Sequence, residues 1–287
     1  MSLVVATHNG PFHADDVLAW SLLTVFGSDP MTLVRTRDAA KLQAADMVFD
    51  VGGVLDPEQC RFDHHQATYT GDNSSAGMVL LWLEKTERVS PELAANLRHR
   101  LVDYVDDVDN GRRAPDANVP CFPSIVEALN SQAGTLEEFD EVFVQAAQLG
   151  EAYLRGLVAA FEAVARARST VLAAMADAVE RDSRVIYLAE YERWKPIYFA
   201  HDGETHPTDF VLFPSNDGTW RIVAIPPRLG DFSQKRSLPE SWAGLSGDEL
   251  TAVTGIAGSM FCHKNRFIAV FETRDNALEA IEVHGLG

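Results

Sequence analysis

The sequence predicts a two-domain α/β protein, with a mainly parallel sheet and flanking helices, a helical connection and a smaller mixed α/β domain. The chain has 287 residues, more than the roughly 250 at which one hydrophobic core usually stops growing. Its first third alternates short apolar runs with helical patterns, as βαβ units of parallel sheets do. A long proline-free helical pattern separates this part from a second group of strands. We therefore expect the parts 1–134, 135–182 and 183–287.

The first part is expected to contain three strands and three helices. The strands are assigned to residues 3–6, 33–36 and 47–51, and the helices to 15–26, 39–45 and 74–85. Asp15 and Asp16 fall in the first helical turn, where negative charge suits the helix dipole. Ser74 is a candidate N-cap. Ligands of such sheets bind beyond the carboxyl ends of the strands, so polar residues there are the candidates for function.

The rest of the chain is first helical and then strand-rich. Residues 135–182 are rich in Ala, Glu and Arg but keep no strict heptad, which favours one or two packed helices over a coiled-coil arm. Strands are expected at 184–190, 209–213, 220–225 and 267–272, with turn signals between them. A last helix is expected at 276–281. This pattern is typical of a small mixed sheet.

The composition limits the classes of partner. Asp and Glu number 42 against 24 Lys and Arg, a net charge of −18. Such a field repels a long polyphosphate, so an extended nucleic-acid-coating surface is not expected. A short phosphoester substrate stays compatible if metal ions supply positive charge locally.

The cysteine pattern and the apolar runs indicate a cellular compartment. Three cysteines, at 60, 121 and 262, are too widely spaced for a zinc motif and suit reduced thiols. No apolar stretch approaches the roughly 18 residues that a membrane-spanning helix needs. We expect a cytoplasmic protein without a membrane partner.

Histidines and acids gather at expected strand ends and loops. The clusters are 7–16 (THNGPFHADD), 50–53 (DVGG), 61–66 (RFDHHQ) and 103–111 (DYVDDVDNG). Imidazoles mixed with carboxylates, without thiolates, suit Mn²⁺, Mg²⁺, Co²⁺ or Fe²⁺. A buried carboxylate costs several kcal/mol unless it is paired or ligated. Four clusters at one sheet edge therefore favour more than one cation.

Ordinary structural roles compete with this interpretation. Asp15 and Asp16 alone suit a helix start, and the acids at 103, 106 and 109 suit a solvated helix face. Adjacent histidines after an acid, as in Asp63-His64-His65, are harder to explain structurally. Taken together, the clusters favour a metal site.

The motifs also carry a family resemblance. Asp63-His64-His65, with the upstream His/Asp cluster, resembles the DHH phosphoesterase superfamily. The phrases THNGPFHADDVLA, VRTRD, VFDVGGVLDPEQCRFDHHQ, NSSAG and VDDVDNG, in this order, resemble the melanocyte-proliferating-gene (Myg) family, as do WRIVAIPP and VTGIAGSMFCHKNRFIA in the C-terminal half. The resemblance spans essentially the whole chain, and it implies a DHH-like catalytic domain over 1–134 and a substrate-binding domain over 183–287.

The resemblance implies a role for each matching residue. It implies two divalent ions, with Mn²⁺ first and Mg²⁺, Co²⁺ or Fe²⁺ as alternatives. The implied metal ligands are His8, His13, Asp15, Asp50, His64 and Asp109, with Asp16 and Asp106 as fallbacks. His13 stands where the superfamily usually has an aspartate. Asp50 would bridge the two ions, His65 would face the substrate phosphate, and Asp63 would orient the site.

The C-terminal half is expected to hold the substrate. The stretch 228–274 carries a net charge of +1, against −19 for the remainder. The candidate substrate-binding residues are His263, Lys264, Arg266 and Arg274. Relatives often carry glycines where this chain has Ala269-Val270 and Asn276, and glycine would let backbone approach a phosphate closely.

The sequence and the resemblance together indicate a two-metal phosphodiester hydrolase, an exonuclease acting on RNA or short oligonucleotides. One alternative is a phosphohydrolase of pyrophosphate, polyphosphate or a cyclic dinucleotide. Another is a metal-binding interaction protein without turnover. Association into a homo-oligomer is compatible with the long helical connection.

Overall fold

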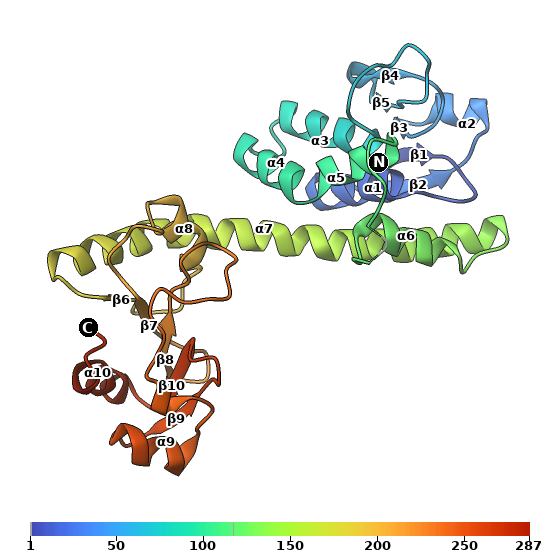
Figure 1. Ribbon diagram of the computed structural model, residues 1–287. Coiled ribbons are helices and arrows are strands. Elements are labelled where there is room, and N and C mark those ends of the chain that lie inside the picture. Colours follow the sequence, from blue (N-terminus) through green and yellow to red (C-terminus); the bar gives the residue numbers. More distant parts are fainter. Residues whose placement is uncertain (1, 117) are drawn as a thin grey trace. The chain divides into compact units, whose positions relative to one another are not determined.

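The computed structural model describes residues 2–116 and 118–287. It divides into two compact units, Met1–Phe161 and Glu162–Gly287, and each contains a five-stranded sheet with helices (Figure 1). The predicted mixed α/β fold class is confirmed. The division between the units falls inside α7 (Leu136–Glu180), so the expected helical connection is one helix of 45 residues.

The sheet of the first unit, sheet A, has the order β2-β1-β3-β5-β4. Its strands are β1 (Leu3–Thr7), β2 (Met31–Arg35), β3 (Met47–Phe49), β4 (Leu55–Asp56) and β5 (Arg61–Phe62). All neighbours are parallel except β4, which runs antiparallel to β5. The two-residue strands β4 and β5 were not predicted, because they are too short to show alternation. The carboxyl ends of β1, β3 and β5 meet at one edge.

Helices cover both faces of sheet A. The helices α1 (Ala14–Phe26) and α3 (Ser75–Lys85) pack against each other and share a core with Val5 and Phe49. Ala6 and Val48 point the other way and pack with Leu42 of α2 (Ala39–Ala44). This alternation along β1 and β3 is that of a sheet buried on both faces.

A helical run then brings one carboxylate to the start of α3. The helix α4 (Pro91–Leu97) continues through the π-helical η2 (Arg98–Val102) into α5 (Asp103–Asp109). Such π segments are frequent at functional sites. Asp106 Oδ1 accepts hydrogen bonds from Ser74 N (3.0 Å), Ser74 Oγ (2.6 Å) and Gly77 N (3.2 Å). Any side chain at Gly77 would collide with this carboxylate. Asp106 thus caps α3 from another helix.

The second unit is built on sheet B, in the order β6-β7-β8-β10-β9. The strands are β6 (Val185–Tyr187), β7 (Phe210–Pro214), β8 (Trp220–Ala224), β9 (Ser259–Cys262) and β10 (Ile268–Phe271). Four of them lie within the predicted ranges or one residue beyond, whereas β9 was not predicted. The helical elements that follow α7 in this unit are α8 (Trp194–Ala200), α9 (Gly247–Thr254), α10 (Arg274–Val283) and η3 (Glu240–Trp242). The first unit also contains η1 (Pro57–Gln59) and α6 (Phe122–Asn130).

A search of the helices in the described residues finds none with the length and apolar character needed to cross a membrane.

Because Asp106 is buried at the start of α3, the difference in stability between wild type and Asp106→Asn should depend on pH. Burial raises the pKa of Asp106 to about 6, from an ordinary value of 3.8, despite its three hydrogen bonds. The folded state therefore favours the protonated acid, and this contribution is full below pH 3.8 and lost as the pH rises through 6. The free energy of unfolding of wild type minus that of Asp106→Asn should fall by up to about 3 kcal/mol between pH 4 and pH 7. Urea unfolding at a series of pH values measures it, and a pH-independent difference would contradict this assignment.

Candidate metal centre

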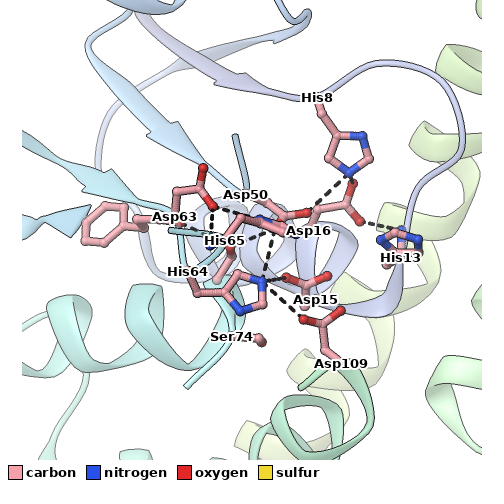
Figure 2. A network of polar contacts seen from close by, with 12 residues as sticks. His8, His13, Asp15, Asp16, Asp50, Asp63, His64, His65, Ser74 and Asp109 are labelled. Carbon is pink, nitrogen blue, oxygen red and sulfur yellow. Dashed lines mark hydrogen bonds and ion pairs between the residues drawn. The ribbon is translucent and has the colours of Figure 1, made fainter. Parts of the chain in front are cut away.

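Histidines and acids from five segments converge at the carboxyl edge of sheet A. His8 follows β1, Asp50 follows β3, and His64 follows β5. Asp15 lies in the first turn of α1, and Asp109 ends α5. Figure 2 shows their side chains pointing toward one another. The topology of a parallel sheet therefore brings together residues that lie a hundred positions apart in sequence.

Local backbone structure aims Asp50 into the centre. Asp50 has a φ of 56°, in the left-handed region that aspartate tolerates better than most residues but still at a cost. Its N–H donates to Phe62 O (3.1 Å), and Ser75 Oγ donates to its Oδ1 (3.2 Å). The neighbouring strand and the start of α3 thus hold this strained conformation in place.

Asp50 is common to three groups of potential metal ligands, one of which also contains His64 and His65. His8, His13 and Asp50 offer ligand atoms that lie within 4.8 Å of one another. On the other side, His64 Nε2 lies 3.4 Å from Asp50 Oδ1. The same nitrogen lies 3.2 Å from Asp109 Oδ2 and 3.8 Å from Asp15 Oδ2. Neighbouring ligands on an ion with bonds of about 2.1 Å are roughly 3–3.5 Å apart. The arrangement fits two ions with Asp50 between them.

The hydrogen-bonding state of the donors supports the same fit. Asp15 and Asp16 are fully buried and Asp50 is 3% exposed. Within the described residues, neither oxygen of Asp15 has a hydrogen-bond partner. Asp16 Oδ2 and His64 Nε2 have only ion-pair contacts, the shortest with His8 (3.1 Å) and Asp109 (3.2 Å) respectively. Buried polar atoms without partners are costly and rare. Oxygen and imidazole donors of this kind suit Mn²⁺, Mg²⁺, Co²⁺ or Fe²⁺.

The electrostatics of the centre show an excess of negative charge. Burial alone lowers the pKa of His8, but its contacts with Asp16 and Asp50 outweigh burial and raise it to about 10. Burial raises the pKa of Asp15 well above its ordinary value, and the charges of Asp50, Asp109 and Asp16 raise it further. Burial also acts to raise the pKa of Asp50, yet the contacts with His64 and His8 dominate and lower it. Protons on the histidines thus compensate charge that divalent ions would neutralise.

Asp63 holds His65 at the surface of the centre. Asp63 Oδ1 lies 2.8 Å from His65 Nδ1 and accepts a hydrogen bond from His65 N (3.0 Å). Asp63 Oδ2 accepts from Gly53 N (2.5 Å). The His65 side chain is 61% exposed, so its ring is oriented by a buried carboxylate and stays accessible. A carboxylate that orients an imidazole in this way is typical of histidines at metal sites, and His65 also forms a group of potential ligands with Asp50 and His64. The contact of His65 with substrate stays a prediction.

The structure separates the two fallback ligands from each other. Asp16 Oδ2 lies 3.1 Å from His8 Nε2, and Asp16 groups with Asp15 and Asp50. Asp106 Oδ1 instead accepts hydrogen bonds from the first residues of α3. Asp106 therefore has a structural role in place of the fallback ligand role. Ser75, which supports Asp50, lies in the helix start predicted at Ser74-Ser75, for which contact with a phosphate is the alternative; its support of Asp50 was not predicted. The signal available was the Ser74-Ser75 pair, since only one serine can occupy the N-cap.

The C-terminal candidates lie at two places in the second unit. His263, Lys264 and Arg266 occupy the turn between β9 and β10, and Arg274 opens α10 at the other end of β10. His263 stacks on Phe267, with ring centres 4.4 Å apart. The guanidinium of Arg274 lies 5.9 Å from the ring centre of Trp220. The structure does not gather these four residues at one site, and their role in binding substrate stays a prediction.

The positions with lost glycines have ordinary roles in sheet B and α10. Ala269 is fully buried within β10. Asn276 lies in the first turn of α10, where its N–H bonds to Thr273 Oγ1 (3.2 Å). Asn276 also contacts Gly258, since a side chain at Gly258 would meet its amide oxygen.

Comparison with known proteins identifies relatives over almost the full length. Residues 4–283 match the family model MYG1_exonuc, described as Uncharacterised protein family (UPF0160). A MYG1 protein of Chlamydia trachomatis is 38% identical over 97% of this chain and 95% of its own length. A MYG1 exonuclease of Rattus norvegicus is 31% identical over 96% of this chain and 82% of its own length.

Among solved structures, RecJ from Thermus thermophilus in complex with Mn²⁺ matches 99% of this chain and 52% of its own, at 13% identity and a TM-score of 0.29. We draw nothing on function from a likeness at that level.

Replacing the buried Asp15 should have opposite effects on stability in the absence and in the presence of Mn²⁺. In EDTA at pH 8, Asp15→Asn should stabilise the protein by about 1–3 kcal/mol, because it removes a buried carboxyl group without a hydrogen-bond partner that folding must either protonate or leave charged beside other carboxylates. In Mn²⁺ the wild type should gain stability from the bound ions, and the variant should gain less. Thermal unfolding with and without Mn²⁺ measures both effects.

The matched control is Asp103→Asn, which removes an exposed acid of α5. This control should change neither the stability in EDTA nor the gain in stability on addition of Mn²⁺. An Asp15→Asn variant that is less stable in EDTA and keeps the full response to Mn²⁺ would contradict the assignment of Asp15 as a ligand.

Proposed function

Because the chain belongs to the MYG1_exonuc family, we propose that it removes nucleotides from one end of RNA or of a short oligonucleotide. At the coarser level, the chain is a metal-dependent phosphoesterase. The observation that carries the proposal is the cluster around Asp50, in which several carboxylates are buried together and that of Asp15 accepts no hydrogen bond from the described residues. A cluster of this kind is costly to fold and is explained by bound divalent ions.

We assign the candidate ligands to two ion positions. His8 and His13 would hold one ion, and Asp15, His64 and Asp109 the other, with Asp50 shared between them. Mn²⁺ is the preferred ion, since it accepts imidazole and carboxylate together, as do Co²⁺ and Fe²⁺ and, less readily, Mg²⁺. When bound, such ions supply a nucleophilic water at neutral pH and stabilise charge on phosphoryl oxygens.

His65 and Asp63 are the chain's own contribution to substrate contact. The hydrogen bond between Asp63 Oδ1 and His65 Nδ1 places the proton on Nδ1 and leaves Nε2 for the substrate. A protonated ring donates from both nitrogens, one to Asp63 and the other to a phosphoryl oxygen. Because the hydrogen bond exists before substrate arrives, the donor needs no reorganisation.

The net charge of −18 favours a short substrate, because a long polyanion is repelled. The same observation keeps a small-molecule phosphohydrolase as the second candidate. A cytoplasmic location and a homo-oligomeric state belong to the proposal as well.

The proposal predicts stepwise shortening of end-labelled RNA. Oligonucleotides of two to ten nucleotides should lose single nucleotides in Mn²⁺ and stay intact in excess EDTA. Asp50→Ala should lose activity by at least about 1000-fold, and Asp63→Ala by about 100-fold, because the first removes the shared ligand and the second only an orienting group. Gel analysis of the labelled products gives the rate and the direction of attack.

The control Asp103→Ala, on the same helix as Asp109, should match wild type. If wild-type protein with two bound ions shortens no oligonucleotide but consumes pyrophosphate or a cyclic dinucleotide, the second candidate replaces the first. Consumption of no phosphoester at all would leave a metal-binding interaction protein.

A further inference from the structure

Two cavities border the metal centre, and His13 and His65 line both of them. One has a volume of about 330 Å³ and is also lined by Arg37, His8, Asp50 and Asp63. The other has a volume of about 680 Å³ and extends along α5 and α6. The two histidines thus belong to the walls of both cavities, which adjoin the same group of candidate ligands. Both are formed by residues of the first unit alone, and the larger is in the size range of small-molecule sites.

Arg37 is the one Lys or Arg among the described residues that line either cavity. It is exposed, and it forms no ion pair or hydrogen bond with any described residue. The carboxylates of Asp15, Asp16, Asp50, Asp63 and Asp109 carry five negative charges, which two divalent ions would largely neutralise. Among the described residues that line the cavities, Arg37 is then the one guanidinium that can pair with a phosphodiester.

The contrast with Arg35 shows that an arginine near this edge can be used structurally. The Arg35 side chain is 2% exposed and pairs with Asp140 (2.8 Å). It also donates to Gly10 O (2.7 Å) and lies over the ring of Phe143. The Arg35 side chain thus connects β2 to the loop after β1 and to α7. Arg37, two residues later, has no such partner and its guanidinium is free for a ligand.

The larger cavity differs from the smaller one because no Lys or Arg lines it among the described residues. Apolar side chains line it from α5 and α6, among them Val108 and Val126. Its polar lining combines three histidines with the carboxylates of Asp109 and Glu127 and the amides of Asn110 and Asn130. These residues offer no guanidinium to pair with a phosphate, whereas a neutral ring with hydrogen-bonding edges fits apolar sides and amide groups. The cavity therefore suits a nucleoside rather than the charged backbone.

We propose that the metal centre binds a terminal nucleotide that extends over both cavities. Arg37 would pair with its phosphate, and its nucleoside would occupy the larger cavity. This inference rests on the proposed phosphodiesterase function and extends it to the substrate's placement. The ligand class is a nucleoside monophosphate unit, held bidentately by a guanidinium at one end and by apolar contact at the other.

Direct binding tests this placement without turnover. Isothermal calorimetry would compare adenosine 5′-monophosphate with adenosine on Mn²⁺-loaded protein. Arg37→Ala should weaken the monophosphate by about 10- to 100-fold and leave adenosine unchanged, because only a charge-assisted phosphate contact is lost. Arg37→Lys should lie between, since it keeps the charge and loses the fork. Val108→Phe should weaken both ligands by about tenfold, because it narrows the nucleoside side.

The control Arg100→Ala removes an exposed arginine of the same unit that lines neither cavity. It should leave both affinities unchanged, and the Mn²⁺ content of every variant should match wild type. An equal effect of Arg37→Ala on both ligands, or none, would overturn the phosphate assignment. Unchanged binding in Val108→Phe would overturn the nucleoside assignment. Absence of oligonucleotide hydrolysis would refute the proposed function instead, and the binding data would still be readable.

Discussion

Three carboxylates, from Asp15, Asp16 and Asp50, are buried together at the carboxyl edge of sheet A, and the described residues do not satisfy all of their oxygens. In water each would be solvated, so folding the chain around them costs several kcal/mol that packing must offset. Histidines reduce this cost when they are protonated, as the raised pKa of His8 shows. Divalent ions remove it more fully, and the rest of the first unit is arranged so that they can bind.

That arrangement depends on supports that never contact an ion themselves. Asp106 fixes the start of α3, and α3 presents Ser75 to Asp50. Asp50 keeps a left-handed backbone conformation, which the bond from its N–H to Phe62 O helps to hold. Asp63 likewise orients the ring of His65 through its hydrogen bond with Nδ1. The strain and burial at the centre are therefore stabilised by neighbouring elements, as is usual at sites kept ready for a ligand.

Much of this centre was readable from the sequence, because parallel strands place their carboxyl ends together. The clusters around His8, Asp50 and His64 follow β1, β3 and β5, as that rule requires. The family resemblance ranks Asp109 above Asp106 as a ligand, but the role of Asp106 as a cap of α3 was not readable, since a spacing of three puts both acids on one helix face and only the position of α3 separates them. The contrast between Arg35 and Arg37 likewise depends on tertiary partners, Asp140 above all, that lie far along the chain.

In the proposed centre, the carboxylate of Asp50 is shared by two ions and organises both. Mn²⁺ bound per chain can be counted by equilibrium dialysis, and magnetic coupling between ions can be followed by electron paramagnetic resonance. The account predicts two coupled ions in wild type, since a bridging carboxylate keeps them about 3.5–4 Å apart. It predicts that Asp50→Ala loses both the coupling and at least one ion. A wild type that binds a single ion, or an Asp50→Ala variant that keeps two coupled ions, would contradict it.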